Sequence, residues 1–250
     1  MLEIHNLTKI YDGKVIAVDN VSFEVKKGEF LAVIGLSGSG KSTLLRCINR
    51  LIEPTSGQIM WNNIDITSAS QTEMRNVRRK IGMVFQHFNL VSRSKVITNV
   101  LSGRLGYINP ALSLINRFPQ KDIEMALKQL DRVGIADQAY KRADELSGGQ
   151  QQRVGVARAM MQEPEIILAD EPVASLDPVL AHSIMQYLEK LNKEDGVTIL
   201  CSLHFLDLVH EYADRAIALN QGQLMFDGPP KEIDDARFRS IYGQEAKRVG

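Results

Sequence analysis

A glycine-rich segment near the start of the chain restricts its fold more than any other part of the sequence. The segment reads Gly35-Leu36-Ser37-Gly38-Ser39-Gly40-Lys41-Ser42 and fits the pattern G-x-x-x-x-G-K-[ST] without a gap. An apolar run, Phe30 to Ile34, precedes it and predicts a buried strand. Apolar residues with helical spacing follow it, at Leu44, Leu45, Ile48 and Leu51, in a helix that Pro54 and Gly57 close. A strand, a glycine-rich turn and a helix in this order predict an α/β fold that binds phosphate at the turn.

The residue types in this segment suit the phosphates of a nucleotide. Glycines let the backbone wrap a phosphate closely, because a Cβ would block either the required φ angle or the approach. Lys41 is expected to reach the β- and γ-phosphates, and the Ser42 hydroxyl to bind Mg²⁺. The predicted ATP-contacting residues here are Gly35, Ser37, Gly38, Ser39, Gly40, Lys41, Ser42 and Thr43. The alternative is a glycine-rich turn that binds no ligand.

A second run, Leu146-Ser147-Gly148-Gly149-Gln150, opens a helix-like stretch far downstream. Its backbone N–H groups would lie at a helix N-terminus, where unpaired donors and the helix dipole favour a phosphate. We interpret Ser147, Gly148, Gly149 and Gln150 as the second half of an ATP site. An unliganded turn before a helix is the alternative, and the presence of the first segment argues against it.

Two carboxylates, Asp170 and Glu171, follow the apolar run Ile166 to Ala169. This places them at the carboxyl edge of a predicted sheet, where ligands bind in open α/β folds. Successive strand residues point in opposite directions, so the pair can divide its tasks. We expect Asp170 to hold Mg²⁺ through its water shell and Glu171 to orient and deprotonate the attacking water. Alone, such a pair is more often a helix cap or a turn.

Three further residues are candidates for the same site. Gln86 follows the strand-like run Ile81 to Phe85, and its amide could touch both the metal shell and the attacking water. His204 follows a strand-like run that ends near Cys201, where an imidazole can contact a γ-phosphate. Tyr11 is expected in an N-terminal loop, with stacking on adenine or simple packing as its alternatives.

Short apolar runs predict how the chain is organised. Runs from Leu2 to Leu7, Val15 to Val25 and Gly57 to Trp61 indicate an antiparallel layer. From His87 to about Met161 the pattern is helical, with Ile123, Ala126, Leu127, Leu130 and Val133 on one face and Gly134 as a stop. Strand-like runs at 166–170 and 197–201 then bracket a helical stretch, 178–193, as in a βαβ unit. Runs at 215–219 and 223–226 indicate a hairpin.

Composition excludes several classes of protein. Lys and Arg together number 30, as do Asp and Glu, so no global charge gathers nucleic acid or anionic lipid. The basic cluster at Arg75, Arg78, Arg79 and Lys80 fits a solvated helix face better than a polyanion site. The two cysteines lie in apolar segments and predict buried free thiols. With no signal peptide pattern and no membrane-spanning run, the chain is expected to be cytosolic and to meet a membrane only through a partner.

Taken in order, the motifs closely resemble those of the ATP-binding cassette (ABC) ATPases over essentially the whole chain. The resemblance rests on Tyr11, Gly35 to Ser42, Gln86, Leu146 to Gln150, Asp170-Glu171, Ser175-Leu176-Asp177 and His204. It implies a single domain of the α/β class: a P-loop NTPase (RecA-like) core with an antiparallel β subdomain, residues 1–86 and 162–250, and an inserted α-helical subdomain, residues 87–161. It also assigns Gln86 to the metal site and Asp177 to the nucleotide site.

The resemblance further implies the partners. Two copies would form a head-to-tail homodimer, in which each ATP lies between Lys41 of one subunit and Ser147 to Gly149 of the other. The segments Phe85 to Val91 and Val100 to Tyr107 are similar to the ATPases of phosphonate importers, whose relatives would serve phosphite or phosphate. A transmembrane permease, docked on the stretch from His87 to about Pro110, and indirectly a periplasmic or lipoprotein solute-binding protein are then expected. The subunit would lie on the cytoplasmic face of the cell membrane.

Two departures and four alternatives accompany this assignment. His87 replaces a more usual Gln, and Ala174-Ser175 replaces Ser-Ala, which makes Asp177 a firmer assignment than Ser175. A soluble ABC ATPase of DNA repair would carry long coiled coils between Gln86 and Ser147, which are only 61 positions apart (147 − 86). A translation factor of this type usually has two cassettes, and a P-loop kinase has no use for Leu146 to Gln150. An importer of a different solute is a further alternative, because the cargo never touches this subunit.

Overall fold

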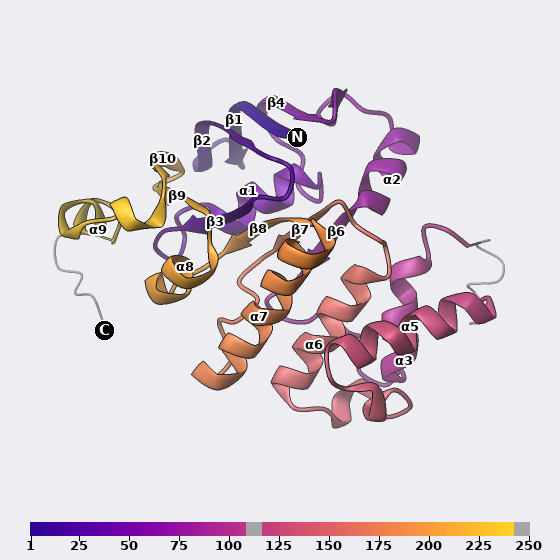
Figure 1. Cartoon of the computed structure of the whole chain (residues 1–250). Coiled ribbons are helices and arrows are strands. Elements are labelled where there is room, and N and C mark those ends of the chain that lie inside the picture. Colours follow the sequence, from indigo (N-terminus) through magenta and orange to yellow (C-terminus); the bar gives the residue numbers. More distant parts are fainter. Residues whose placement is uncertain (109–116, 243–250) are drawn as a thin grey trace.

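A six-stranded sheet runs through the middle of the molecule in the order β10-β9-β3-β8-β7-β6 (Figure 1). The computed structural model describes residues 1–108 and 117–242. The strands are β3 (Phe30–Ile34), β6 (Ile81–Val84), β7 (Ile166–Ala169), β8 (Thr198–Ser202), β9 (Arg215–Asn220) and β10 (Gln223–Gly228). All neighbours pair in parallel except β9 and β10, which form the predicted hairpin. The carboxyl ends of the parallel strands therefore meet at one edge, which is where such folds bind ligands.

Strand β3 is buried on both faces, as its sequence predicts. Phe30, Ala32 and Ile34 pack into one hydrophobic core, and Leu31 and Val33 into a second core on the other face. A strand covered on both sides has no solvent face and therefore reads as a continuous apolar run rather than as an alternation.

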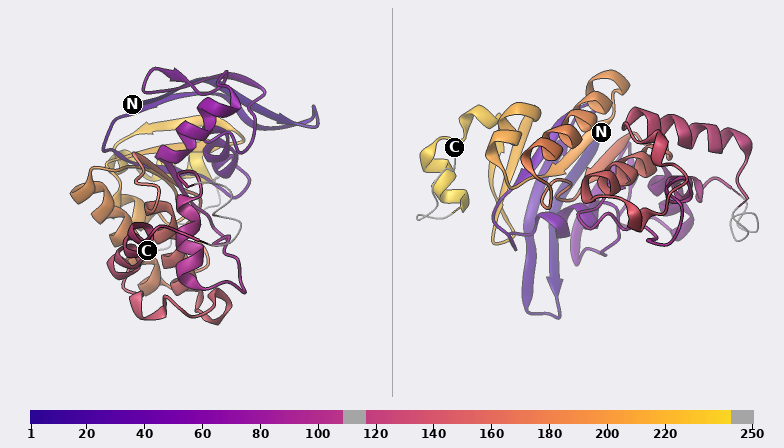
Figure 2. Two further views of the ribbon diagram at one scale, coloured as in Figure 1. Left: turned by 90° about the vertical axis from the view of Figure 1, so that its right-hand side faces the viewer. Right: turned by 90° about the horizontal axis from the view of Figure 1, so that it is seen from below.

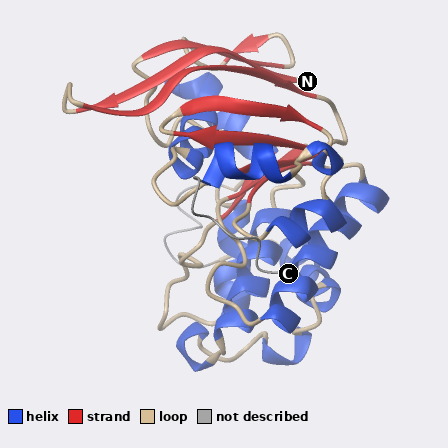
Figure 3. Cartoon of the chain, turned by 90° about the vertical axis from the view of Figure 1, so that its left-hand side faces the viewer, coloured by secondary structure: helices blue, strands red, loops and turns tan. Residues whose placement is uncertain are grey.

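A four-stranded antiparallel sheet lies over the second of these cores, as expected (Figure 3). It has the order β2-β1-β4-β5, with β1 (Leu2–Tyr11), β2 (Val15–Val25), β4 (Ser56–Trp61) and β5 (Ile64–Asp65). Tyr11 is the last residue of β1 and pairs with Val15, so the prediction that it lies in a loop is wrong. The alternation of hydrophobic and polar residues weakens towards this end of the strand, so the sequence pattern underestimates the length of β1.

Helices cover the opposite side of the six-stranded sheet and extend away from it (Figure 2). The helices outside the strand-rich part are α3 (Val96–Leu101), α5 (Gln120–Arg132) and α6 (Gly148–Met160), with short 3₁₀ turns at Ser102–Arg104, Ala136–Gln138 and Ala143–Glu145. This agrees with the helical character predicted from His87 to Met161. Ala126 and Leu130 of α5 are fully buried, and Gly134, with φ of 69°, follows its end.

Other described helices lie closer to the strands. Helices α1 (Lys41–Ile48), α2 (Gln71–Lys80) and α7 (Pro178–Asp195) contact strands directly, as α6 contacts β6. Helix α8 (Leu206–Tyr212) packs on α7, and α9 (Asp235–Tyr242) packs against β9 and β10. Helix α1 ends at Ile48, earlier than predicted, because Arg50 adopts a left-handed φ of 46°. Leu51 is therefore outside the helix and 49% exposed.

The cysteines and the membrane prediction can be compared directly with the structure. Cys47 and Cys201 are both free and buried, as expected, and burial raises the pKa of the Cys47 thiol to about 12. Within residues 1–108 and 117–242, no helix has both the length and the apolar character that a membrane span requires.

Candidate functional site

The glycine-rich segment forms a tight turn between β3 and α1. Gly35 and Gly40 have φ angles of 141° and 106°, which side chains rarely adopt. A Cβ at Gly35 would lie 2.2 Å from the Leu219 carbonyl oxygen, and one at Gly40 would lie 2.1 Å from that of Ala17. The turn is also tied to the β9–β10 hairpin, because the Gly222 N–H donates to the Ser39 carbonyl at 3.0 Å. The backbone therefore forms a fixed concave loop.

Lys41 lies buried at the start of α1. Its ammonium group donates to the carbonyls of Gly35 and Leu36, both at 3.0 Å, and lies 3.8 Å from Glu171 Oε1. Burial lowers the pKa of Lys41, and the nearby Glu171 and Asp170 oppose that effect. Ser37 and Gly38 are exposed at the tip of the loop, Ser39 is buried, and Ser42 and Thr43 are half-buried behind it.

Asp170 and Glu171 lie at the carboxyl end of β7, where the sequence places them. The Asp170 N–H donates to the Val84 carbonyl of β6 at 2.9 Å, and its carboxylate is buried. Glu171 has a left-handed φ of 49°, which turns its side chain towards Lys41. The Arg46 guanidinium lies 2.9 Å from Asp170 Oδ2. The two carboxylates thus have different neighbours, one an arginine and the other a lysine.

His204 joins the same cluster. Its Nε2 atom lies 2.7 Å from Glu171 Oε1, and the direction of the proton depends on the tautomer. Lys41, Glu171 and His204 come from three different parts of the sequence and meet at the edge formed by β3, β7 and β8. The arrangement brings together a cation for phosphate, a carboxylate that can accept a proton and an imidazole.

Ser202 is a member of this cluster that sequence reasoning missed. Its hydroxyl accepts the Glu171 N–H at 2.8 Å and lies 3.5 Å from Asp170 Oδ1. It is fully buried at the end of β8, beside β7. Its position at the carboxyl end of a predicted parallel strand was the available signal, since polar side chains there face the ligand edge.

The remaining predicted residues lie near the cluster or apart from it. Gln86 is half-buried just after β6, the strand next to β7, so it lies on the same edge of the sheet. Tyr11 ends a strand of the other sheet, and the Lys9 ammonium lies 5.0 Å from its ring centroid. Asp177 caps α7, with its Oδ1 accepting the Leu180 N–H at 3.1 Å. The contacts of Tyr11 and Asp177 with a nucleotide therefore stay predictions.

The run Leu146 to Gln150 begins α6, away from the β3–α1 turn of the same chain (Figure 1). Ser147 and Gln150 form a capping box: the Ser147 N–H donates to Gln150 Oε1 at 3.0 Å, and the Gln150 N–H donates to Ser147 Oγ at 3.4 Å. Ser147 and Gly148 are exposed. One chain therefore presents this helix start outward rather than to its own glycine-rich turn.

The cluster fits a magnesium–phosphate ligand. The turn leaves Gly38 without any neighbour that a Cβ would meet, so a phosphate can approach its backbone. Hydroxyl and carboxylate oxygens, at Ser42 and Asp170, are the ligands that Mg²⁺ prefers. Among the described residues there is no group of three or more His, Cys, Asp or Glu side chains that could hold a metal.

Comparison with known proteins points to one family. The family profile described as ABC transporter matches residues 18–174. The chain is 53% identical to "Phosphonates import ATP-binding protein PhnC 1" of Halalkalibacterium halodurans, over 99% of this chain and 96% of that protein. It is 51% identical to "Phosphonates import ATP-binding protein PhnC" of Shouchella clausii, over 98% and 92% of the two chains.

Solved structures agree with this match. An ATP-binding cassette in a dimeric post-hydrolysis state, bound to ADP and Pi, has a TM-score of 0.82 and 36% identity, and it covers 92% of this chain and 99% of its own. The ADP conformation of an ATP-binding cassette of an ABC transporter has a TM-score of 0.83 and 31% identity, with 96% of both chains covered. The predicted α/β fold with a P-loop is confirmed, and the chain belongs to the ABC transporter family of ATP-binding proteins.

Proposed function

We propose that this protein is the ATP-binding and ATP-hydrolysing subunit of an importer that takes up phosphonate, or a similar oxyanion such as phosphite or phosphate, through a partner permease. The observation that carries the hydrolytic part is the meeting of Lys41, Glu171 and His204 at one edge of the sheet. The assignment of the cargo is supported by the printed names of the relatives that are about half identical over nearly the whole chain.

Each residue of the cluster has a role that its position supports. Lys41 binds the β- and γ-phosphates after its ammonium leaves the Gly35 and Leu36 carbonyls. Glu171 orients a water molecule and accepts its proton as the water oxygen bonds to the γ-phosphorus and ADP departs. His204 holds the Glu171 carboxylate and contacts the γ-phosphate. Gln86, at the end of the neighbouring strand, contacts the metal shell and the attacking water in this proposal.

Ser42, Asp170 and Gln86 would hold Mg²⁺, which would neutralise part of the phosphate charge. Asp170 becomes available once Arg46 moves away from it. That movement is feasible because the Arg46 side chain is 42% exposed, whereas the Asp170 carboxylate is fixed and buried. Tyr11 stacks on the adenine in this proposal.

A homodimer completes the site. Since Ser147, Gly148, Gly149 and Gln150 do not face the P-loop of their own chain, they serve the ATP of a second copy, together with Asp177. Cassettes that share the fold of this chain have been solved as dimers, which supports a dimer for this chain. ATP then closes the dimer, and hydrolysis removes the contacts that hold it closed.

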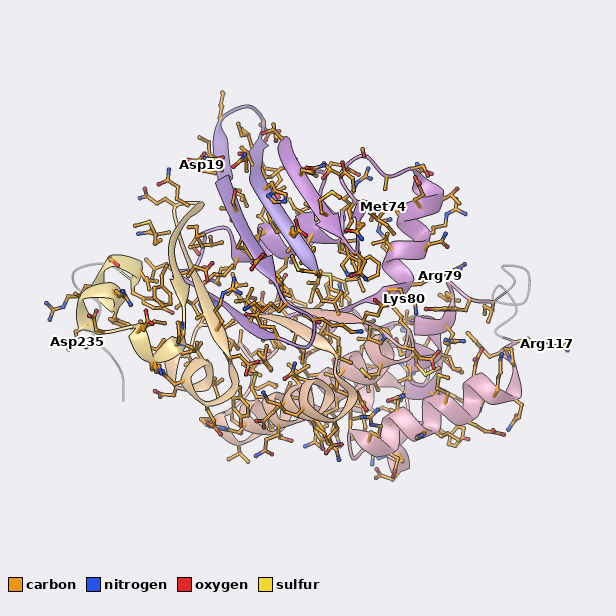
Figure 4. All side chains as sticks on the ribbon, turned by 45° about the horizontal axis from the view of Figure 1, so that its top comes forward. Asp19, Met74, Arg79, Lys80, Arg117 and Asp235 are labelled. Carbon is orange, nitrogen blue, oxygen red and sulfur yellow. The ribbon has the colours of Figure 1, made fainter. Side chains whose placement is uncertain are left out.

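The permease docks beside α2. A cavity of about 250 Å³ is lined there by Arg75, Arg78, Arg79, Ser102, Gly103, Gly106, Tyr107 and Gln162. Four of these residues belong to the docking stretch predicted from His87 to Pro110, of which Asn109 and Pro110 lie outside the described residues. Arg79, which Figure 4 labels at the end of α2, lies with its guanidinium 5.2 Å from the Tyr107 ring centroid and has no carboxylate partner among the described residues. An acidic cytoplasmic segment of the permease fits this cavity.

In this proposal the subunit is a peripheral protein on the cytoplasmic face of the membrane. A solute-binding protein would then act on the far side of the permease, without touching this chain. Charge reversal at Arg79 tests the docking site: Arg79→Glu should reduce co-purification with the permease, and the isolated subunit should keep its ATPase activity. Normal co-purification of that variant would contradict the site.

Two substitutions test the shared catalytic site. Glu171→Gln should bind ATP normally, lose nearly all turnover and accumulate as an ATP-bound dimer, which size-exclusion chromatography detects. Near-normal steady-state ATPase activity in this variant would refute the role of Glu171. Adding Ser147→Arg to Glu171→Gln should abolish the dimer and leave ATP binding by the monomer intact, because the P-loop of that chain is complete. A loss of ATP affinity in the monomer would instead indicate a site within one chain.

Growth tests the cargo. A strain that lacks this gene should fail to grow on a phosphonate as its only phosphorus source and should recover when the gene is returned, but not when the Glu171→Gln variant is returned. Parallel cultures on phosphite and phosphate separate the three oxyanions. Unimpaired growth on all of them would point to a different solute.

A further inference from the structure

The loop that follows Gln86 has a strained backbone. Phe88 and Asn89 are consecutive residues with φ angles of 58° and 50°. Asparagine enters this left-handed region readily, but the Cβ of phenylalanine is forced against a carbonyl oxygen. Such a conformation persists only where the surrounding structure holds it in place.

A single side chain of α6 binds both strained residues. Arg158 donates from Nη2 to the Phe88 carbonyl at 2.9 Å and from Nη1 to the Asn89 carbonyl at 2.5 Å. Its guanidinium also lies 5.9 Å from the centroid of the Phe85 ring, one residue before Gln86. The planar fork of arginine suits this pair of neighbouring acceptors, which a single ammonium group could not span in the same way.

Arg158 forms no ion pair within the described residues. Burial lowers its pKa, and no carboxylate offsets that effect. Arg158 is half-buried, and a cation that is partly removed from water is normally paired with an acid, because losing hydration is costly. In this protein the carbonyl dipoles of Phe88 and Asn89 stabilise the charge of the Arg158 guanidinium, which therefore stays bound to the loop.

The same loop lies along α6 up to the run Leu146 to Gln150, the signature of this family. A Cβ placed on Gly148 would be 3.7 Å from Phe88 Cζ, and one placed on Gly155 would be 3.9 Å from the Phe88 carbonyl oxygen. Phe88 therefore spans the distance from the exposed start of α6 to Arg158. Further along, the Ser92 and Ser94 carbonyls accept the Asp144 and Ala143 N–H groups, each at 3.0 Å, just before the signature.

We propose that Arg158 is a positioning residue that couples the loop after Gln86 to the signature helix. It does not touch ATP. It keeps Phe88 and Asn89 in their observed conformation. The loop thereby connects the sheet edge that binds ATP to Ser147–Gly149, the surface that the same subunit presents to its partner. Without this tie, each subunit binds ATP in its own P-loop but presents a poorly placed signature. This inference rests on the shared-site dimer proposed above.

The test uses ATP-driven dimerisation in the Glu171→Gln chain. Arg158→Met keeps the length of the side chain but removes its donors. We expect ATP affinity of the monomer to change less than about twofold and the protein concentration for half-maximal dimerisation to rise at least about tenfold. Adding Asn89→Gly should recover part of the loss, because glycine has no Cβ penalty at a left-handed φ, whereas asparagine retains a small one. A purely structural role of Arg158 predicts no such recovery.

A matched control lies on the same helix. Arg153 donates to the Val133 carbonyl and to Ser183 Oγ, and its guanidinium lies 5.4 Å from the Tyr187 ring centroid, so it resembles Arg158 but does not bind the loop. Arg153→Met should change dimerisation less than about threefold. Equal losses in both arginine variants, with no recovery by Asn89→Gly, would overturn the proposal.

Further measurements distinguish failure of the Arg158 proposal from misfolding and from failure of the proposed dimer. If Arg158→Met does not fold, Arg158→Lys replaces it in the test. Faster amide hydrogen exchange at residues 87–91 in the folded Arg158→Lys monomer would support the proposal, and unchanged exchange would contradict it. If the Glu171→Gln parent itself does not dimerise with ATP, the proposed function fails. If the parent dimerises and the Arg158→Met variant matches it, only the role of Arg158 fails.

Discussion

The imidazole of His204 lies 2.7 Å from the carboxylate of Glu171, although 33 positions separate the two residues in the sequence (204 − 171). The contact exists because β7 and β8 are adjacent parallel strands that end at the same level. A carboxylate held by an imidazole has one orientation rather than several. The base of the proposed reaction is therefore positioned before any substrate arrives.

Removing this contact should lower turnover and leave binding almost unchanged. For His204→Ala we expect a loss of about 100-fold in kcat, with the ATP dissociation constant within about threefold, because the imidazole acts on Glu171 and on the γ-phosphate during hydrolysis. His5→Ala is a suitable control, since His5 is exposed on β1. A His204→Ala enzyme with wild-type turnover would argue that the contact has no catalytic role.

The Arg46–Asp170 pair predicts a stability change that nucleotide reverses. Arg46→Met leaves a buried carboxylate without its partner, which should lower the free energy of unfolding by about 1–3 kcal/mol in the absence of ligand. The partial exposure of Arg46 favours the lower end of this range. Because Mg²⁺ with ATP replaces the lost positive charge, the difference should shrink in its presence. Urea unfolding with and without the ligand measures both values.

A control for this prediction is Lys190→Met, which breaks an exposed pair with Glu194 one helical turn away. Its effect should be below about 0.5 kcal/mol, and magnesium nucleotide should not alter it. If the deficit of Arg46→Met persisted unchanged at saturating Mg²⁺ and ATP, Asp170 would not be the carboxylate that faces the metal.

The glycines of the P-loop differ in how they should tolerate alanine. At Gly40 an added Cβ meets the Ala17 carbonyl at 2.1 Å in a left-handed conformation, so Gly40→Ala should cost about 3 kcal/mol or more in unfolding free energy. Gly38 also has a positive φ, of 79°, but no neighbour within 4 Å, so Gly38→Ala should cost only about 1 kcal/mol. Thermal unfolding without nucleotide tests this order, and equal losses would contradict it.

Lys41 predicts how nucleotide affinity depends on pH. Its pKa is lowered in the free protein, mainly by burial, and a bound triphosphate raises it again. ATP affinity should therefore be constant below the lowered pKa and fall as the pH rises above it, with proton uptake on binding between the two values. Calorimetry in alkaline buffers of different ionisation enthalpy measures this uptake. Lys41→Arg should show no uptake in this range, because arginine stays charged.

The same shift has a consequence for stability. The folded-state pKa of Lys41 lies below that of the unfolded chain, so the unfolded chain binds more protons between the two values. The stability of the free protein should therefore rise with pH in that window. Lys41→Met, which carries no titrating group, should lack this rise in denaturant unfolding experiments.

The sequence predicted the strands of the nucleotide edge well. Phe30 to Ile34 and Ile166 to Ala169 are apolar throughout because both faces of the sheet are covered, and their polar residues begin where each strand ends. Spacing alone therefore placed Lys41, Asp170 and Glu171 at the correct edge.

The contacts around these residues were not predictable in the same way. Ser202 and Arg46 approach Asp170 because of the strand order and the direction of α1, which no local pattern encodes. Helix α9 was missed, since its apolar face is small and is satisfied by packing on β9 and β10. The length of α1 was overestimated because Leu51 continues the helical spacing while the backbone at Arg50 already leaves the helix.

The P-loop is held from two directions before nucleotide arrives: Gly40 lies against the Ala17 carbonyl of β2, and Ser39 accepts the Gly222 N–H of the hairpin. A binding surface that is preorganised in this way loses little conformational entropy when the ligand enters. In the proposed dimer, more of the favourable free energy of ATP binding is then available for bringing the second subunit onto the γ-phosphate. A rigid P-loop would thus leave the free energy of ATP binding available to drive movement elsewhere in the transporter.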